Sequence, residues 1–226
     1  MDVYLETTEK RSFACAVDWP GWCRSGRDEE AALEALLAYG PRYASVLDGT
    51  GIPFEAPRDV SAFHVVERLK GNATTEFGAP AMIPSSDMEP VDDAELARME
   101  ALLKAYWRAF DAARSAAGGK ELRKGPRGGG RDLQKIVSHV MDAEAGYLRS
   151  LGRKMDKDRA PDLEGELRRT REAVLEALPV AARGDVPDRG PRGGARWPLR
   201  YFVRRTGWHV LDHTWEIEDR MNHRDE

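Results

Sequence analysis

The spacing of apolar residues changes near residue 83, and this change limits the possible folds more than any other feature of the sequence. Val3 and Leu5, and then Phe13, Cys15 and Val17, fall at every second position. This alternation is typical of strands with one buried face. After residue 92 the apolar residues recur every three or four positions, as in amphipathic helices. The sequence therefore predicts an α+β protein in which a small strand-containing part precedes a helical part.

The strand-containing part also predicts one helix and a second pair of strands. Residues 27–47 (RDEEAALEALLAYGPRYASVL) have helical spacing, and Asp28 is a suitable N-cap followed by two glutamates. Residues 63–77 (FHVVERLKGNATTEF) predict a strand, a turn at Gly71-Asn72 and another strand. The expected order is strand, strand, helix, strand, strand.

The two cysteines predict neither a metal site nor a disulfide. Cys15 lies on an expected strand as a buried apolar residue, and Cys23 follows Trp22 in an expected turn. There is no C-x-x-C pair, which excludes a zinc knuckle. The first ten residues lack a basic head and an apolar run, and no stretch approaches the roughly 18 apolar residues of a membrane span. We therefore expect a cytoplasmic protein, in which a disulfide would not persist.

The helical part predicts a bundle. Residues 83–92 (IPSSDMEPVD) are marked by proline and serine, which predicts domains at 1–82 and 93–226 joined by this linker. Connections of short or moderate length favour four helices that alternate in direction, up-down-up-down. We expect the third to stop at Pro179. The four expected helices span 92–117, 131–152, 162–179 and 198–221.

A five-residue sequence, GPRGG, occurs at 125–129 and again at 190–194. Each copy comes just before the second or the fourth expected helix, which suggests two helical hairpins in tandem with both loops at one end of the bundle. Arg127 and Arg192, one in each loop, could bind a carboxylate or a phosphate at the mouth of a site. The alternative is that both are solvated loop arginines.

Three of the five histidines lie on the second and fourth expected helices. His209 and His213 are four residues apart and share one helix face, while His139 lies at the edge of the apolar face of its helix. Facing helices of a bundle often assemble metal sites. Neutral imidazoles suit zinc, nickel, iron or copper, and three ligands leave one position open for water or substrate. The alternative is hydrogen-bonded core histidines, and we expect no role for His64 and His223.

Two carboxylates lie close enough in sequence to orient a histidine ligand. Glu216 and Asp212 are the candidates, although helical geometry favours the outer face for Asp212. We expect Trp208 to pack against a neighbouring helix rather than a substrate. No residue stands out as a general base. A bound metal would itself activate water or a thiol by lowering its pKa.

Residues 93–221 resemble the DinB/YfiT-like family, which is a four-helix bundle with one histidine on the second helix and HxxxH on the fourth. The matching positions are His139, His209 and His213. The resemblance implies a divalent metal, most often nickel or zinc. It also implies a metal-dependent transferase or hydrolase that uses a low-molecular-weight thiol such as bacillithiol or mycothiol.

Residues 1–80 resemble a HicB-type antitoxin domain, with the match concentrated in the first forty-five residues. The segment 13–40 (FACAVDWPGWCRSGRDEEAALEALLAYG) carries a strand, a Pro-Gly turn and an acidic helix start in the matching places. The resemblance implies a small fold related to the double-stranded-RNA-binding domain. Members of that family neutralise an RNA-cleaving toxin.

Two functions from different classes follow as expectations. The first is a divalent-metal-dependent enzyme acting on a small molecule, either a thiol-dependent S-transferase or a hydrolase. The second is a non-enzymatic, HicB-like partner-binding regulator with a structural or vestigial metal. A purely structural helical bundle is a third possibility. The formal net charge of −4 and the lack of a phosphate-binding loop argue against a nucleic-acid partner, and a homodimer stays open.

Overall fold

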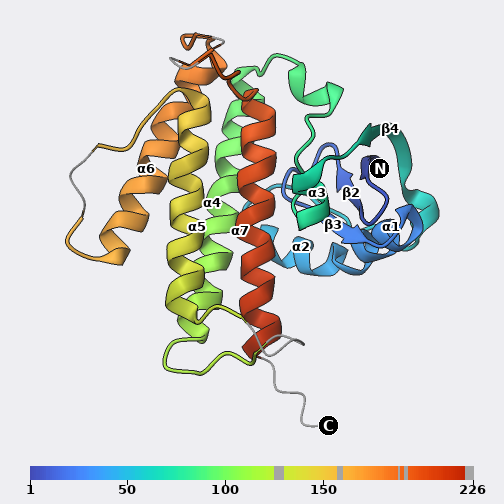
Figure 1. Cartoon of the computed structure of the whole chain (residues 1–226), viewed down its shortest axis with the longest axis horizontal. Coiled ribbons are helices and arrows are strands. Elements are labelled where there is room, and N and C mark those ends of the chain that lie inside the picture. The colour runs from blue at the N-terminus through green and yellow to red at the C-terminus, as the bar shows by residue number, and fades with distance from the viewer. Residues whose placement is uncertain (125–129, 157–159, 188, 191–192, 222–226) are drawn as a thin grey trace.

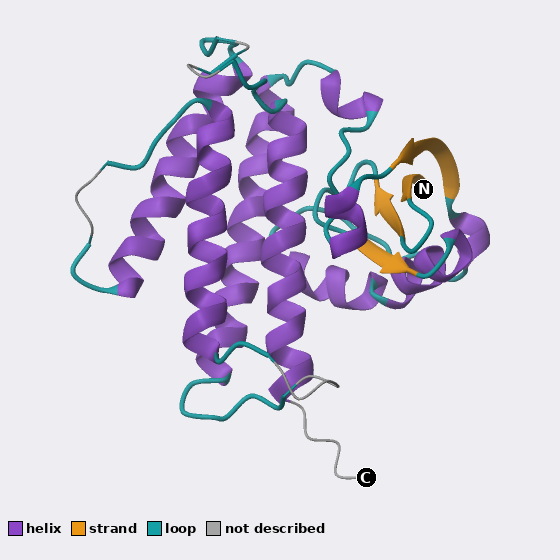
Figure 2. Ribbon diagram, viewed as in Figure 1, coloured by secondary structure: helices purple, strands orange, loops and turns teal. Residues whose placement is uncertain are grey.

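The computed structural model describes residues 1–124, 130–156, 160–187, 189–190 and 193–221. Its N-terminal part contains a four-stranded sheet in the order β3-β2-β1-β4, with α-helices beside it (Figures 1 and 2). β1 pairs antiparallel with β2 and parallel with β4, while β2 pairs antiparallel with β3. The strands are β1 (Asp2–Thr7), β2 (Ser12–Ala16), β3 (Cys23–Gly26) and β4 (His64–Lys70).

The alternation in β1 and β2 divides the sheet into two buried faces. Val3 and Leu5 pack into the larger core with Leu36 of α1 (Glu29–Ala38). Tyr4 and Phe13, on the opposite face, pack with Trp208 of the last helix. The sheet therefore lies between its own helix and the C-terminal helices, with both faces covered.

Two details of the N-terminal part differ from the expectation. The predicted helix over 27–47 is broken into α1 and α2 (Gly40–Leu47), because Pro41 starts a new helix. The strand expected after Gly71 is the short helix α3 (Ala73–Phe77). Asn72 caps α3 in a reciprocal pair with Thr75. The N-cap predicted for α1 is confirmed, since Asp28 accepts from the backbone N–H of Ala31.

The expectation of unpaired cysteines is wrong. Cys15 and Cys23 form a disulfide between β2 and β3, where they are direct cross-strand partners. Cys23 also lies on a strand and is buried, not in an exposed turn. The spacing of two cysteines in sequence does not reveal this pairing, because it depends on the register of the two strands.

Four long helices lie side by side in the C-terminal part (Figure 1). They bury apolar stripes at the expected spacing, such as Met99, Leu103, Tyr106 and Phe110. The first and second of these helices each contact both the third and the fourth. The prediction of an α+β chain with a small sheet followed by helices is confirmed. The four are α4 (Asp93–Ala116), α5 (Leu133–Leu148), α6 (Leu163–Ala182) and α7 (Leu199–Met221).

The predicted up-down-up-down alternation is wrong. Arg114, near the end of α4, pairs with Glu164 at the start of α6, and Leu133 at the start of α5 lines the same hollow as Glu164. Arg200 and Glu95, which pair, lie in the first turns of α7 and α4. Thus α5 and α6 run parallel to each other and opposite to α4 and α7, as Figure 1 shows.

The connection between α5 and α6 makes this topology possible. Residues 152–162 can span roughly 36 Å when extended, and a helix the length of α6 spans roughly 30 Å. The two glycine-rich connections consequently lie at opposite ends of the helices. Gly130 lies against Arg220 near the end of α7, whereas Arg196 lies against Gly190 and hydrogen-bonds Arg149 beyond the end of α5. In addition, α6 runs through Pro179 to Ala182 instead of stopping there.

The N-terminal part packs against α7 and α4 through one continuous core. Gly207 of α7 allows this close approach, since a Cβ there would lie 2.7 Å from the ring of Tyr106 and 3.3 Å from Gly21. Residues 83–92 include a 3₁₀ turn (Ser85–Met88), whose Asp87 is buried and paired with Arg204. The division at 1–82, 83–92 and 93–226 stays a prediction, but the expected linker is itself part of the packed structure.

Candidate metal centre

Three histidines converge where α5 faces α7. His139 comes from α5, and His209 and His213 come from successive turns of one face of α7. A ligand atom from each of the three lies within 4.8 Å of the others, and the Nε2 atoms of His139 and His209 are 3.2 Å apart. The predicted convergence of the three imidazoles is confirmed.

This geometry fits a tetrahedral transition-metal ion. An ion about 2.0–2.1 Å from each nitrogen holds its nitrogen ligands roughly 3.4 Å apart, close to the separation of His139 and His209. Among the described residues, the buried Nδ1 of His209 has no hydrogen-bond partner. Burying an imidazole with so few partners costs free energy, which metal ligation through Nε2 would offset. The three histidines can therefore hold a metal ion.

Burial favours the neutral, metal-binding form of His209 and His139. His209 and His213 are 6% and 8% exposed, whereas His139 is only half-buried and forms the open side. Burial, followed by the neighbouring His213 and His139, holds the pKa of His209 well below its usual value. Burial and the charge of Arg131 also lower the pKa of His139.

Glu216 orients one of the three ligands. Its Oε2 lies 2.7 Å from Nδ1 of His213, and its Oε1 accepts from Arg220 at 2.7 Å. Burial alone would raise the pKa of Glu216, but the hydrogen bonds and charges of His213 and Arg220 lower it. The carboxylate leaves Nε2 of His213 free for a metal. Asp212 instead pairs with Arg24 of β3, so of the two candidates the structure selects Glu216.

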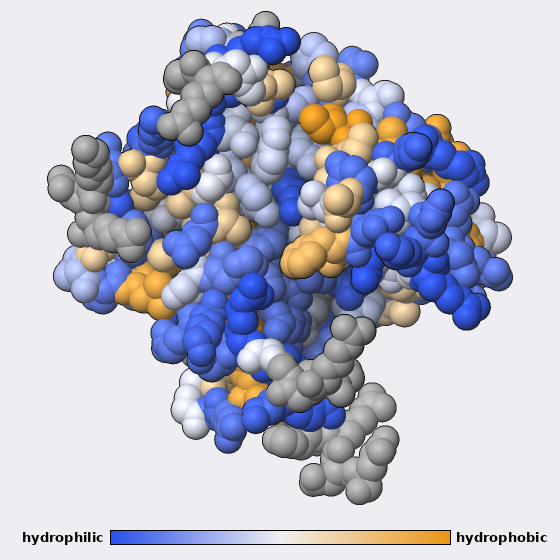
Figure 3. Space-filling model, viewed as in Figure 1, coloured by the Kyte–Doolittle hydropathy of each residue, from blue (hydrophilic) through white to orange (hydrophobic). Residues whose placement is uncertain are grey.

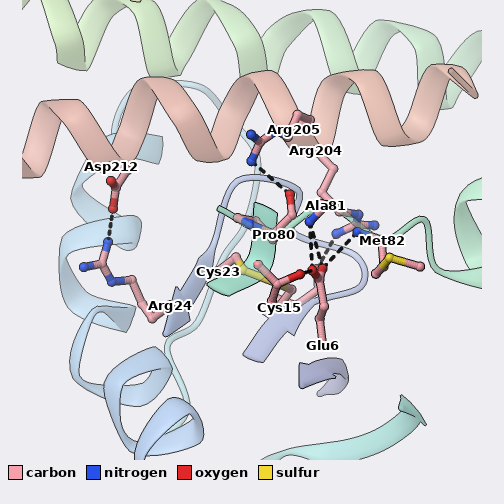
Figure 4. The surroundings of a disulfide bond; sticks show 12 residues. Glu6, Cys15, Cys23, Arg24, Pro80, Ala81, Met82, Arg204, Arg205 and Asp212 are labelled. Carbon is pink, nitrogen blue, oxygen red and sulfur yellow. Dashed lines mark hydrogen bonds and ion pairs between the residues drawn. A yellow bond between two sulfur atoms is a disulfide. The ribbon is translucent and has the colours of Figure 1, made fainter. Parts of the chain in front are cut away.

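The N-terminal part braces the segment of α7 that carries the histidines (Figure 4). Arg204 donates to the carbonyl oxygens of Ala16 and Val17, which directly follow Cys15. Arg24, which directly follows Cys23, donates to Asp212. The disulfide therefore ties together the two strands that contact α7 before and after His209.

Trp208 is buried against a neighbouring element, although not against the expected helix. It is 5% exposed, and its ring makes an edge contact with Phe13 of β2 at 6.2 Å between centroids. The neighbour is a strand, not a helix. Because its ring is buried against the sheet, Trp208 is not available to a substrate. The contact also holds α7 in place next to His209.

Sequence reasoning missed two residues beside the triad, Tyr147 and Arg205. The ring of Tyr147 lies 5.8 Å from that of His209, and the guanidinium of Arg205 stacks on Tyr147 and Trp208. Helical spacing provided a signal, since Arg205 is four residues before His209 on α7.

Other predicted site residues lie elsewhere. Arg127, Arg192 and His223 lie outside the described residues, so their predicted roles stay predictions. His64 is on β4, mostly exposed, with Nδ1 3.7 Å from Asp2. Of the predicted site residues within the described part of the chain, the three histidines and Glu216 lie together.

A second hollow of about 290 Å³ lies between the N-terminal part and the first turns of α4 and α7. Its three arginines are already engaged: Arg98 by the carbonyl oxygen of Asp18, Arg200 by Glu95 and Arg204 by Asp87. These contacts join the N-terminal part to α4 and α7, so the three arginines of this hollow have structural partners.

No protein-family model matches the chain, and neither a curated protein nor a solved structure matches it. Among the described residues, no helix combines the length and apolar character needed to cross a membrane. The face in Figure 3 is largely hydrophilic, with its apolar residues in small groups. The function is therefore inferred from the geometry of the site.

Proposed function

We propose that the protein is a divalent-metal-dependent enzyme of the DinB-like type that acts on a small molecule. In this proposal α4–α7 form a DinB-like four-helix bundle, and His139, His209 and His213 bind nickel or zinc. The observation that carries the proposal is the convergence of three imidazoles from two facing helices, with Glu216 behind one of them.

The reaction class follows from the ligand set. Three neutral nitrogen ligands leave an open position, as in catalytic sites. A metal bound there supplies Lewis acidity and lowers the pKa of a bound water or thiol. The chain holds the ion with its histidines, fixes His213 with Glu216 and admits ligands past the half-exposed His139. We infer a thiol-dependent S-transferase or a hydrolase.

The alternative is a HicB-like, non-enzymatic regulator in which the sheet binds a partner and the metal is structural. The packing favours the enzyme, because Arg24, Phe13 and the strand carbonyls contact α7 around the histidines. The N-terminal part thus contributes to the scaffold of the site. A small-molecule partner belongs to this proposal, with no nucleic-acid partner. The expected cytoplasmic location stays a prediction, and the disulfide between Cys15 and Cys23 argues against it.

Metal content tests the site. The purified protein, loaded with nickel or zinc and passed through a desalting column, should retain about one ion per chain by elemental analysis. His213→Ala should lose it, whereas His64→Ala, which removes an exposed histidine on β4, should retain it. Absence of metal in the unaltered protein, or full retention by His213→Ala, would refute the site.

Ligand exchange separates the enzyme from the regulator. Cobalt(II) replaces zinc in tetrahedral sites and reports its ligands by visible and near-ultraviolet absorption. Addition of 2-mercaptoethanol to the cobalt-loaded protein should produce a sulfur-to-cobalt band if one position is open. An unchanged spectrum would indicate a closed, structural metal and favour the regulator.

A further inference from the structure

A cationic and aromatic wall adjoins the histidines on the side away from Glu216. Arg205 lies one turn before His209, with its guanidinium carbon 4.7 Å from the ring centre of Trp208 and 5.6 Å from that of Tyr147. Its Nη1 donates to the carbonyl oxygen of Pro80 at 2.9 Å. Contacts from α5, α7 and the loop at Pro80 thus hold Arg205 in one place.

Tyr147 supplies a second donor to the same wall. It lies on α5 between His209, at 5.8 Å between ring centroids, and Arg205. A phenol keeps its proton at neutral pH, so Tyr147 can act as a hydrogen-bond donor. A neutral hydroxyl beside a guanidinium can donate a hydrogen bond to an oxyanion.

The surface of α5 is open at Gly146, next to Tyr147. Gly146 precedes Tyr147 and lies two helical turns after His139, on the same face of α5. A Cβ added at Gly146 would meet no atom within 4 Å. The face of α5 that carries His139 is therefore open beside the wall.

The charges around the triad favour an anion. Arg205 interacts electrostatically with His209, and Arg131 does so with both His139 and His209. The carboxylates that act on the histidines are Glu216, already bound by Arg220, and Asp142 near His139. A divalent ion on three neutral imidazoles adds two positive charges to this group. Such a centre attracts an anionic ligand.

We propose that Arg205 and Tyr147 form a carboxylate-binding subsite next to the metal. The co-substrate is then a small molecule with a metal-binding donor such as a thiol and, a few bonds away, a carboxylate. The inference rests on the proposed metal-dependent function and specifies its substrate class. The spacing is suitable, since one helical turn rises 5.4 Å, about the length of a short thiol acid.

The N-terminal part also holds the loop that contacts Arg205. Glu6 is fully buried and accepts hydrogen bonds from the backbone N–H groups of Ala81 and Met82, at 2.9 and 3.0 Å, and from the hydroxyl of Thr75. These bonds anchor the loop whose Pro80 holds Arg205, as Figure 4 shows. Glu6 is thus a positioning residue that acts through Arg205.

The test compares two thiols that differ in charge. Cobalt-loaded protein is titrated with 3-mercaptopropionate and with 2-mercaptoethanol, and the sulfur-to-cobalt absorption gives both dissociation constants. The ratio of the two constants isolates the effect of the carboxylate. Arg205→Gln should lower the preference for 3-mercaptopropionate by about tenfold or more, as expected for a lost charge-assisted hydrogen bond. Tyr147→Phe should lower it by roughly threefold to tenfold.

One matched control and one further variant separate the possible outcomes. Lys104→Gln, on the outer face of α4, removes a positive charge far from the triad and should keep the original ratio. If Arg205→Gln fails to fold by circular dichroism, Tyr147→Phe decides the matter. Cobalt binding with an unchanged ratio in these variants would overturn the subsite and leave the proposed function standing. Failure of the unaltered protein to bind cobalt would overturn the proposed function, and the subsite with it.

Discussion

Glu216 shows how a single carboxylate can prepare a metal ligand. Its two oxygens are divided between Nδ1 of His213 and the guanidinium of Arg220, so the imidazole is fixed in both position and tautomer. Asp212, four residues earlier, has the same charge but faces Arg24. The two carboxylates differ in the partners that they meet, which are Arg24 for Asp212 and His213 with Arg220 for Glu216.

Replacing Glu216 should weaken metal binding. Glu216→Gln loses the charge that supports His213, and we expect a roughly 10–100-fold lower affinity for zinc. Competition with a chromogenic chelator measures this affinity. Asp212→Asn is the matched control, and its zinc affinity should change much less. Equal losses in the two variants would mean that Glu216 acts only through general stability.

Glu144 should make the stability of the protein depend on pH. It is fully buried on α5, where burial raises its pKa to about 7, although Arg171 and a hydrogen bond from Trp107 oppose this shift. An acid with a raised pKa in the folded state keeps its proton between about pH 4.5 and 7, whereas the unfolded chain releases it. The free energy of unfolding therefore falls as pH rises through this window.

Glu144→Gln should remove that dependence. Between pH 5 and 8 the stability of the variant relative to the unaltered protein should rise by about 2–3 kcal/mol, since each pKa unit corresponds to about 1.4 kcal/mol. Urea unfolding at several pH values measures the difference. Glu172→Gln, at an exposed position of α6, should show no such trend. A flat difference for Glu144→Gln would contradict the raised pKa.

At the scale of the element, α7 combines two tasks. It carries two of the three metal ligands, and it is also the helix onto which the sheet packs. Gly207 allows the second task, because the helix touches Tyr106 and Gly21 there. A helix with such a close contact on one side and ligands on another holds its histidines in a fixed orientation.

Alanine at two helical glycines should have opposite effects. Gly207→Ala would place a Cβ 2.7 Å from the buried ring of Tyr106, and the clash should outweigh the better helix propensity, costing about 1–3 kcal/mol. Gly146→Ala meets no atom within 4 Å and should stabilise the protein by up to about 1 kcal/mol. Thermal unfolding measures both. Stabilisation by Gly207→Ala would show that α7 is not packed this closely.

The β2–β3 pair should depend on its disulfide. Closing a loop of this length stabilises a folded protein by about 2–3 kcal/mol in the chain-entropy account. A reductant should therefore lower the free energy of unfolding by that amount. The double variant Cys15→Ala/Cys23→Ala should be insensitive to the reductant, which serves as the control. An unaffected unaltered protein would argue against the bond.

At the scale of the whole molecule, the sequence predicts local features better than connections. The alternation in β1 and β2, the Asp28 cap and the apolar stripe of α4 are properties of neighbouring residues, and all three occur as expected. The triad was predictable for a similar reason, since helical spacing puts His209 and His213 on one face. The prediction that His139 joins them needed one further assumption, that its helix faces the helix of His209 and His213.

The failures in topology and in the site concern interactions that periodicity does not encode. The connection 152–162 is long enough to return along the helices, so the sequence allows either direction for α6, and the repeated GPRGG carries no information about which end it occupies. The disulfide depends on the pairing of Cys15 with Cys23 across two strands. Arg205 and Tyr147 gain their significance only when α5, α7 and the loop at Pro80 meet.

X-ray absorption at the zinc edge tests whether three histidines hold one metal ion, because it counts the ligands of the bound ion. For the zinc-loaded protein the account predicts three imidazole nitrogens at about 2.0–2.1 Å and one exchangeable oxygen or sulfur. A His139→Ala variant should show one imidazole fewer. A spectrum with fewer than three imidazoles in the unaltered protein, or with a fourth ligand from the protein, would contradict it.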